Sequence, residues 1–542
     1  MTTTARAVAA LLAEAGIDRV FGLPGGEVLV LMDELRRAGV DFVLMRHEAN
    51  AGIAAGVYGK LRRQPGVVVT TLGPGAANLM LPLSNSFLDQ EPLLAISAQI
   101  PDDFPPAHTH QRLPLHDAYR SITRYSAKIT ADTVHDVVSR ALAACMNRPF
   151  AAAYLTLSAR EALKPTSDLV ARSFQASGPR SAESLALHRT ELDSRAHARE
   201  IAGLFARAQR PLVLIGLGID PRNATRLRRW LNAWNVPVAV TPKVKGIVDE
   251  TGDNFVGVVG GMAADDLMCD ALRAADLLVG FGLDPVEIDK TWHAELPIHW
   301  VLEAPNVGEL VPPGTPLVDH AQFLDALSGE PPPRTWNAPF GDFQQKRRHL
   351  DKRPTTNDQP TTMWPGDIVR ALADALPAST IVTTDVGSHK YLFGQFWPSR
   401  EPETFWVSNG LSGMSYALSA AIGASLARPD VPVLAAVGDG GFSMNAQELE
   451  TAERVGARFI SIVLEDRSYS LIKLAQEGRT LDPYRTDFNP IDTVKMAEAC
   501  GVDALRTTNP DELTAAARQG VQRRRSLVVG VPVDYADYRR LL

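Results

Sequence analysis

The chain has 542 residues, of which 45% are hydrophobic and 22% charged, a composition typical of soluble proteins with several hydrophobic cores. Its net charge of −7, with no dominant block of basic residues, argues against a nucleic-acid partner. No apolar run approaches the length of a membrane span. Residues 2–17 read as an amphipathic helix and not as a targeting segment, because Glu14 interrupts the apolar run and no basic stretch precedes it.

The cysteines lie far apart, at Cys145, Cys269 and Cys500. This spacing gives neither a disulfide framework nor the paired thiols of a metal site. Chains without disulfides are typical of reducing compartments, so we expect a cytoplasmic protein.

The first part of the chain alternates between helical patterns and short apolar strands. Up to residue 71, helices are expected at 5–15, 28–38 and 49–62, and strands at 19–21, 42–45 and 66–71. This alternation is typical of a doubly wound parallel sheet with helices on both faces. We therefore predict an α/β domain over residues 1–165.

A second α/β unit begins near residue 196, after polar sequence at 164–184 that reads as a linker. Its strands are expected near 211–215, 236–241, 276–280 and 299–302. The turn Gly216-Leu217-Gly218 invites a dinucleotide interpretation, but the third glycine of that fingerprint falls on Pro221, so the fingerprint fails. The pattern predicts a central α/β domain over residues 186–330.

The third unit follows a long polar linker, which is expected from the proline run at 331–333 to about residue 360. It starts with a helix at 365–376 and a strand at 380–384, which predicts an α/β domain over residues 360–542. The first and third units both place a glycine turn after an early strand, at Gly25-Gly26 and Gly387, a weak sign of a duplicated sheet.

Two acidic residues of the third unit follow two expected parallel strands. An apolar run at 433–437 stops at Gly438-Asp439-Gly440-Gly441, and another at 459–464 ends in Glu465-Asp466. Open α/β sheets bind ligands at this edge, and glycines there let backbone N–H groups approach a phosphate. Carboxylates beside a phosphate need a hard cation between them, such as Mg²⁺ or Ca²⁺. A lone Gly-Asp-Gly is more often a tight turn with solvent-facing acids; the second acid favours the phosphate site.

Glu48 stands where the strand at 42–45 passes into a helix of small residues. It would therefore lie at the carboxyl edge of the first sheet. The helix dipole stabilises an acid at this position, so a purely structural role also explains it.

The stretch from Gly438 to Ser468 resembles the diphosphate-binding motif of thiamine diphosphate enzymes, GDG followed further along by NN. The resemblance implies thiamine diphosphate and Mg²⁺ as cofactors. The implied metal ligands are Asp439, Asp466 and the carbonyl of Ser468, and the implied cofactor-binding residues are Gly438, Asp439, Gly440, Gly441 and Tyr469. The NN pair is Glu465-Asp466 here, which adds charge but keeps an oxygen ligand.

Arg46-His47-Glu48 resembles the RHE segment of the same enzymes. There the glutamate hydrogen-bonds the aminopyrimidine ring and promotes the imino tautomer that removes the C2 proton of the thiazolium. The resemblance therefore makes Glu48 both a catalytic and a cofactor-binding residue.

Four further segments resemble parts of that cofactor site, at 21–26, 70–78, 385–389 and 408–414. The residues that they contribute are Pro24, Gly25, Thr71, Asn78, Gly387, Ser388, His389, Ser412 and Met414. Met414 falls where a bulky apolar residue wedges the cofactor into its V shape, and the carbonyl of Ser412 falls where the 4′-amino group is held. The resemblance implies pyrimidine-binding, central and diphosphate-binding domains, and a homodimer or homotetramer with active sites shared between subunits.

Residues 21–26, 87–93 and 531–535 look most like the acetolactate synthase branch, and Gln111 matches its catalytic glutamine. Three departures are visible. Ala159 stands where the lysine of LPKD is expected, and Ala475 where a tryptophan favours 2-oxobutyrate. Residues 283–287 replace the FAD-associated RFDDR-like stretch. These departures argue against FAD and against selectivity for 2-oxobutyrate. The neighbouring His108, His110 and His116 suit either a polar loop or a substrate role, and their spacing does not fit zinc.

The resemblance implies decarboxylation of a 2-oxo acid, most simply pyruvate, with carboligation of the resulting enamine to an acceptor carbonyl. Two catalytic alternatives stay open at this point. One is carbon–carbon bond cleavage of the benzaldehyde lyase or 2-oxo acid decarboxylase type. The other is acetyl transfer to a phosphate held by Arg112 or Arg160. A non-catalytic cofactor-binding subunit is a third alternative, against which the intact Glu48, Asp439 and Asp466 argue. The expected partners are a small 2-oxo acid donor and a carbonyl acceptor, with neither nucleic acid nor membrane.

Overall fold

The computed structural model describes residues 2–105, 107–166, 191–288, 297–304, 311–332, 336, 338–350, 352–353 and 361–541, and only the backbone of 191–193. The expected linker at 164–184 therefore lies outside the described residues from position 167 on. Within the described part of the chain, no helix is long and apolar enough to cross a membrane.

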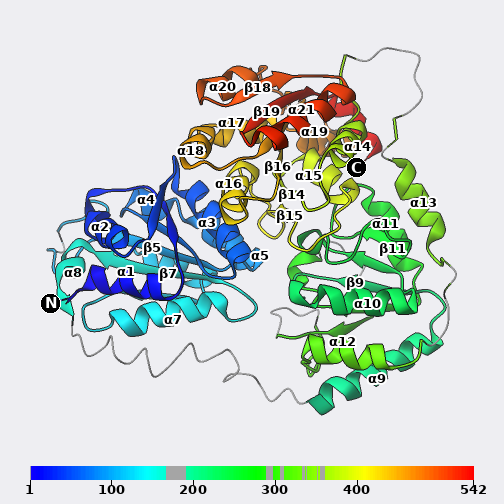
Figure 1. The fold of residues 1–542 in the computed structure, drawn as a ribbon, viewed down its shortest axis with the longest axis horizontal. Coiled ribbons are helices and arrows are strands. Elements are labelled where there is room, and N and C mark those ends of the chain that lie inside the picture. The colour runs from blue at the N-terminus through cyan, green and yellow to red at the C-terminus, as the bar shows by residue number, and fades with distance from the viewer. Residues whose placement is uncertain are drawn as a thin grey trace. The chain divides into compact units, whose positions relative to one another are not determined.

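Three parallel sheets flanked by helices form the fold, which confirms the predicted α/β class (Figure 1). The described residues divide into two compact units. The first unit comprises residues up to 166 together with Leu411–Pro429 and Gln447–Ala457, and the second unit comprises residues 191–410, Asp430–Ala446 and 458–541.

The first unit contains a six-stranded parallel sheet with the strand order β3-β2-β4-β5-β7-β6. Its strands are β2 (Arg19–Gly22), β3 (Asp41–Leu44), β4 (Gly66–Thr70), β5 (Leu93–Gln99), β6 (Tyr125–Lys128) and β7 (Ala152–Ser158). The helices between them are α1 (Thr4–Glu14), α2 (Leu29–Arg37), α3 (Glu48–Arg62), α4 (Pro74–Ala77), α5 (Met80–Asp89), α6 (Leu115–Tyr119), α7 (Val134–Met146) and α8 (Ala159–Leu163). The strands and helices predicted up to residue 71 are all present. A two-stranded antiparallel sheet pairs β1 (Thr2–Thr3) with β8 (Pro165–Thr166).

Helix α3 is buried on nearly all sides, because its small residues let two other helices approach it closely. A Cβ atom at Gly52 would lie 2.5 Å from Cβ of Pro82 in α5. On another side, a Cβ atom at Gly423 of α16 (Ala417–Ala427) would lie 2.3 Å from the carbonyl oxygen of Ala54. Close contact with α16 and α18 (Glu448–Val455) explains why these two helices belong to the first unit.

The second unit begins with a five-stranded parallel sheet of order β11-β10-β9-β12-β13. Its strands are β9 (Pro211–Ile215), β10 (Val238–Val240), β11 (Phe255–Val258), β12 (Leu277–Phe281) and β13 (Ile298–Val301), and its helices are α9 (Glu191–Arg207), α10 (Ala224–Trp234), α11 (Asp265–Arg273) and α12 (His320–Gly329). Sequence reasoning missed β11, a four-residue strand that runs into a glycine-containing turn.

The polar stretch after residue 330, expected to be a linker, contains helix α13 (Gly341–Leu350). The amide of Gln344 donates hydrogen bonds to the carbonyls of Asp253 and Phe255 at 2.7 and 2.9 Å. This part of the stretch is therefore a helix packed on the central sheet, and the linker interpretation is wrong for it.

The second unit also contains a six-stranded parallel sheet of order β15-β14-β16-β17-β19-β18. Its strands are β14 (Ile381–Thr384), β15 (Phe405–Val407), β16 (Val433–Gly438), β17 (Ile460–Glu465), β18 (Asp503–Arg506) and β19 (Leu527–Pro532). The second-unit helices of this part of the chain are α14 (Pro365–Ala375), α15 (Ser388–Phe396), α17 (Asp439–Asn445), α19 (Ser470–Gly478), α20 (Thr493–Ala499) and α21 (Pro510–Arg523). Counted along the chain within each sheet, the first and third sheets have the same strand order, so the two ends of the chain share one topology.

Candidate active site

Glu48 opens helix α3 at the carboxyl edge of the first sheet. Its side chain is only 8% exposed, and its Oε2 accepts a hydrogen bond from Nδ2 of Asn78 at 2.9 Å. A Cβ atom at Gly75 would lie 3.3 Å from Oε1 of Glu48, so the turn at α4 packs directly against this carboxyl group. The first unit thus brings two of the predicted site residues into contact in a nearly buried position.

Pro24, Gly25 and Thr71 follow the neighbouring strands β2 and β4, where the strand order of the first sheet reverses. A side chain at Gly25 would collide with Thr71, since its Cβ would lie 2.3 Å from Oγ1. The Thr71 hydroxyl donates a hydrogen bond to Glu27 at 2.7 Å, which fixes the two loops to each other. Ligands of open α/β sheets bind in the crevice at such a reversal point.

Gln111 lies against the 73–78 segment, which also carries Asn78, the hydrogen-bond partner of Glu48. Its side-chain Cγ and Nε2 are 3.0 and 3.1 Å from the Cβ position of Gly73. The side chain is exposed, and the backbone of Gln111 has a φ of 57°. A substrate-facing role for Gln111 is compatible with this position and stays a prediction.

Ser412 and Met414 lie in the turn before α16 and belong to the first unit. Ser412 is exposed with a φ of 56°, and Met414 is half-buried. Their assigned roles toward the cofactor stay predictions.

The three histidines singled out in the sequence, His108, His110 and His116, lie in different environments. The ring of His116 bridges Oγ of Ser126 and Oγ1 of Thr156, at 2.7 and 3.0 Å, and burial lowers its pKa. His108 and His110 are exposed. His116 therefore ties β6 to β7, which gives it a structural role.

Asp439 and Asp466 stand at the carboxyl ends of the paired parallel strands β16 and β17. Burial and the charge of Asp466 raise the pKa of Asp439 to about 7, and burial raises the pKa of Asp466 to about 6. The N–H groups of Gly440 and Arg467 donate to the Asp439 carboxylate at 2.9 and 2.8 Å. A divalent cation would relieve the repulsion between the two carboxylates, and oxygen ligands of this kind suit Mg²⁺.

No group of three or more His, Cys, Asp or Glu side chains in the described residues is arranged to hold a metal ion. The predicted site therefore depends on the two carboxylates of Asp439 and Asp466 together with the carbonyl of Ser468. Ser468 is buried, and its N–H donates to Oδ1 of Asp466 at 3.1 Å. The 466–468 segment and Asp439 thus meet in the second unit, where the N–H of Arg467 donates to the Asp439 carboxylate.

Glu465, the other residue that replaces the family's NN pair, has a different partner. Its Oε2 accepts a hydrogen bond from Nε of Arg506 at 2.8 Å, and its Oε1 accepts one from Thr493. Arg506 binds Glu465, and the negative charge of Glu465 adds less than that of Asp466 to the raised pKa of Asp439.

Gly387, Ser388 and His389 open α15 beside the glycine turn that follows β16. Cβ atoms at Gly387 and Gly438 would lie 2.5 and 3.1 Å from Cε1 of His389. Burial lowers the pKa of His389 to about 3, so its ring is neutral at physiological pH.

Two polar atoms of this turn, His389 Nε2 and Ser388 Oγ, are buried and have no hydrogen-bond partner among the described residues. Buried polar groups in folded proteins are almost always hydrogen-bonded. A diphosphate would supply an oxygen acceptor for the Ser388 hydroxyl. The neutral His389 ring donates its one proton to the backbone of Asp385, so its Nε2 would donate to a diphosphate only in the protonated ring. The residues of this turn therefore fit the predicted cofactor.

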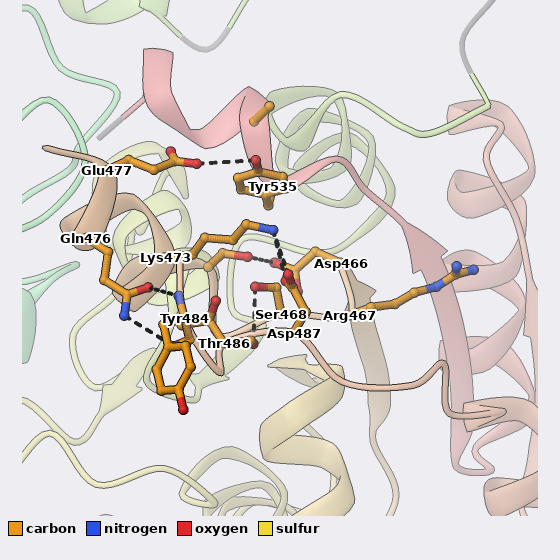
Figure 2. A network of polar contacts seen from close by, with 12 residues as sticks. Asp466, Arg467, Ser468, Lys473, Gln476, Glu477, Tyr484, Thr486, Asp487 and Tyr535 are labelled. Carbon is orange, nitrogen blue, oxygen red and sulfur yellow. Dashed lines mark hydrogen bonds and ion pairs between the residues drawn. The ribbon is translucent and has the colours of Figure 1, made fainter. Parts of the chain in front are cut away.

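Polar contacts hold the segment that follows Asp466 (Figure 2). The hydroxyl of Ser470 donates to Oδ2 of Asp466 at 2.5 Å. Lys473 of α19 binds Asp487 at 2.9 Å, and the Ser468 hydroxyl donates to the carbonyl of Thr486 at 3.3 Å. These contacts anchor the predicted metal ligands to the chain segment around residue 487.

Tyr469 packs against the glycine turn itself. A Cβ atom at Gly440 would lie 3.0 Å from Cε1 of the tyrosine ring, and the ring centroids of Tyr469 and Phe488 are 5.4 Å apart. A different neighbour requires glycine at position 441, because a Cβ atom there would lie 2.0 Å from Oδ2 of Asp385. Sequence reasoning did not single out Asp385 as the neighbour that requires this glycine.

The backbone N–H groups of the glycine turn at 216–218, in the central sheet, are hydrogen-bonded to other groups of the protein. The N–H groups of Gly216 and Gly218 donate to backbone carbonyls at 2.9 and 2.7 Å, and the N–H of Leu217 donates to Oε2 of Glu287 at 2.8 Å. Glu287 also accepts a hydrogen bond from Thr241, and burial raises its pKa to about 8. The N–H groups of this turn are therefore already hydrogen-bonded within the protein and are not free to bind a phosphate.

A cavity of about 200 Å³ lies beside the carboxyl ends of β5, β6 and β7. Its charged lining residues are Asp102, Asp103, Lys128, Arg160, Glu161 and Lys164. Each cation is paired with an acid: Lys128 with Asp102, Arg160 with Asp103, and Lys164 with Glu161. Arg112 points elsewhere, to the carbonyl of His108 at 2.9 Å. The phosphate pocket of the acetyl-transfer alternative therefore gains no specific support.

Sequence reasoning also missed Glu448, the first residue of α18. It is fully buried, whereas Glu450 two residues further on is partly exposed in surface ion pairs. The local pattern of acids gives no signal that separates the two, because the burial of Glu448 depends on packing against residues 46–50.

Comparisons with known proteins agree with this arrangement. Three family models match the chain: the N-terminal TPP binding domain of thiamine pyrophosphate enzymes at residues 2–119, the central domain at 198–327, and the C-terminal TPP binding domain at 385–531.

Among curated relatives, the acetolactate synthase of Bacillus subtilis (strain 168) is 29% identical over 97% of this chain and 92% of its own length. The catabolic acetolactate synthase of Raoultella terrigena is 29% identical over 96% of this chain and 93% of its own length. The acetolactate synthase isozyme 2 large subunit of Escherichia coli (strain K12) is 28% identical over 92% and 90%. The chain belongs to the thiamine pyrophosphate-dependent enzymes and is of the acetolactate synthase-like type.

Proposed function

We propose that this protein uses thiamine diphosphate and Mg²⁺ to decarboxylate a 2-oxo acid, most simply pyruvate, and to join the remaining two-carbon fragment to an acceptor carbonyl. The observation that carries the proposal is the nearly buried Glu48, held by Asn78 at the carboxyl edge of the first sheet. Full-length similarity to acetolactate synthases supports the same reaction.

Bound thiamine diphosphate supplies the nucleophilic carbon and the electron sink for decarboxylation. In this proposal the carboxyl group of Glu48 holds and shares a proton with the aminopyrimidine, and Asn78 orients that carboxyl group. Gln111 faces the substrate.

The remaining predicted residues bind the cofactor and the metal ion. Asp439, Asp466 and the Ser468 carbonyl would hold Mg²⁺. The hydroxyl of Ser388 would donate to the diphosphate, and so would Nε2 of His389, beside Gly438, once the charge of the bound diphosphate favours protonation of the ring. Pro24, Gly25, Thr71, Gly387, Ser412, Met414, Gly440, Gly441 and Tyr469 complete the proposed cofactor-binding set.

We further propose that the protein is a cytoplasmic homodimer or homotetramer with active sites shared between subunits, as the family resemblance implies. The pyrimidine-side residue Glu48 belongs to the first unit and the diphosphate-side residue Asp439 to the second. Domain boundaries of 1–165, 186–330 and 360–542 are part of the same proposal.

Two positions of this chain differ from the acetolactate synthase branch where that branch carries a lysine and a tryptophan. Ala159 begins α8, and Ala475 is exposed on α19, so neither provides the lysine or tryptophan expected from the acetolactate synthase branch. A second pyruvate is the simplest acceptor.

Product analysis by NMR tests this proposal. The protein is incubated with thiamine diphosphate, Mg²⁺ and ¹³C-labelled pyruvate, and acetolactate formation with release of one CO₂ per pyruvate decarboxylated is expected. Parallel samples contain inorganic phosphate or an acyloin. Acetyl phosphate, or acyloin cleavage without ligation from pyruvate, would contradict the proposal and identify the alternative reaction.

A further inference from the structure

Glu448 is a fully buried carboxylate at the start of α18 in the first unit. Its oxygens accept hydrogen bonds from the backbone N–H of Arg46 at 3.1 and 3.2 Å and from Nδ2 of Asn50 at 2.9 Å. The hydroxyl of Thr451 in the same helix donates to it at 2.7 Å. One carboxylate therefore gathers donors from two separate segments of the chain.

The donors from the first sheet flank Glu48 along the chain. Arg46 precedes Glu48 by two residues and Asn50 follows it by two, and the backbone of His47 also donates to Glu448. These bonds fix the end of the β3 loop and the first turn of α3, where the direction of the Glu48 side chain is set.

Packing alone does not explain a carboxylate at this position. Burial raises the pKa of Glu448, which shows that the site opposes its charge. The guanidinium of Arg46 binds Glu450 at 2.7 Å and not Glu448. Hydrogen bonds to the 46–50 segment are therefore what keep the carboxylate in place, and their loss would leave buried donors unsatisfied.

We propose that Glu448 is a positioning residue that holds Glu48 in the orientation required to act on the cofactor. This inference rests on the proposed function, since it assumes that Glu48 acts on bound thiamine diphosphate. Active-site groups must be held within a fraction of an ångström, and a misplacement of about 1 Å costs up to about 100-fold in rate.

Glu448→Gln is the sharpest variant, because glutamine has the same shape but replaces one acceptor oxygen with a donor. Its amide group would face the N–H donors of Arg46 and Asn50 and could satisfy only part of them. Glu450→Gln is the matched control on the same helix. It breaks the exposed ion pairs with Arg46 and Arg454 and leaves the buried hydrogen bonds intact.

Three measurements on the full-length protein separate positioning from folding. Hydrogen–deuterium exchange followed by mass spectrometry reports the protection of residues 44–52 without added cofactor. Isothermal titration calorimetry with thiamine diphosphate and Mg²⁺ reports cofactor affinity. NMR of the bound cofactor reports the exchange rate of its C2 proton.

In Glu448→Gln we expect faster deuterium uptake at residues 44–52 and C2-proton exchange slowed about 10- to 100-fold. Cofactor affinity should change less than about threefold, because the diphosphate and metal ligands are untouched. Glu450→Gln should match the wild type in all three measurements. If Glu448→Gln does not fold, Asn50→Leu removes one of the same hydrogen bonds and should give the same pattern to a smaller extent.

Wild-type C2 exchange and wild-type protection of residues 44–52 in a folded Glu448→Gln protein would overturn the inference. Equal loss in Glu448→Gln and Glu450→Gln would also overturn it, since a general effect on α18 would then explain the result. Failure of the proposed function is distinguishable, because the wild-type protein itself would then fail to accelerate C2 exchange over that of free cofactor.

Discussion

Oε2 of Glu48 and Nδ2 of Asn78 are 2.9 Å apart, and the two residues come from different loops of the first sheet. The partner of Glu48 in this contact is a neutral amide. The amide therefore orients the carboxyl group without forming an ion pair with it. This combination suits a group that shares a proton with a ligand.

Asn78→Asp would place a second carboxyl group beside Glu48. Because an ionised carboxylate cannot donate the hydrogen bond that orients Glu48, kcat should fall at least about tenfold. Asn78→Ala, which removes the amide without adding charge, should also lower kcat about tenfold. The check is kcat of the three proteins at saturating cofactor, and wild-type kcat in both variants would count against the proposed role of Glu48.

Asp466→Asn should change metal binding and stability in opposite directions. The variant removes a carboxylate that raises the pKa of Asp439, so the metal-free protein should gain about 1 kcal/mol in its free energy of unfolding. It also loses an anionic ligand, so Mg²⁺ should bind about tenfold more weakly.

Glu465→Gln is the control for this prediction, because Glu465 binds Arg506 and Thr493. It should lower stability to the same extent with and without Mg²⁺. Thermal unfolding in EDTA and in Mg²⁺ measures both variants, and an Asp466→Asn protein that is less stable than wild type in EDTA would refute the assignment of Asp466 to a metal site.

Glu287 should make the stability of the protein depend on pH. Burial raises its pKa in the folded protein from the ordinary 4.5 to about 8. The protonated form is therefore favoured by folding. Its contribution is fully present below about pH 4.5 and is lost as the pH rises through about 8, with a total on the order of 3–5 kcal/mol.

Glu287→Gln should remove this dependence, because its amide oxygen can accept from Leu217 and its amide NH₂ can donate to Thr241. Urea unfolding at pH 5 and pH 8 should show a smaller difference in the variant than in the wild type. Equal differences in the two proteins would show that Glu287 is ionised throughout.

Neither the wild type nor Glu287→Gln should bind FAD in a direct titration, since the N–H groups of the 216–218 turn are already hydrogen-bonded within the protein.

Gly423→Val tests the close packing of α16 on α3. The new Cβ would lie 2.3 Å from the carbonyl oxygen of Ala54, so one helix must move. We expect a loss of about 2–4 kcal/mol in the free energy of unfolding. Gly203→Ala is the control, because its Cβ would meet nothing closer than a flexible arginine side chain at 4.0 Å, and it should be neutral or slightly stabilising. Equal stabilities of Gly423→Val and wild type would show that the helices are not packed this closely.

Sequence patterns predicted the alternating strands and helices of the first sheet because its buried strands are continuous apolar runs bounded by turns. They also placed Glu48, Asp439 and Asp466 at the carboxyl edges of the sheets. Residues whose roles depend on distant contacts were not predictable in this way. Glu448 differs from Glu450 only in what packs around it, and the burial of Glu287 depends on its hydrogen bond with a turn about 70 residues earlier in the chain. Helix α13 was missed because its polar sequence gives a weak apolar period.

The most direct test of the proposed function is the activity of Glu48→Gln on pyruvate with saturating thiamine diphosphate and Mg²⁺. Glutamine retains the size of the side chain and can still accept a hydrogen bond from Asn78, but it cannot exchange a proton. We predict that CO₂ release falls at least about 100-fold while the cofactor still binds. Wild-type turnover in Glu48→Gln would contradict the role of Glu48 and, with it, the proposed mechanism.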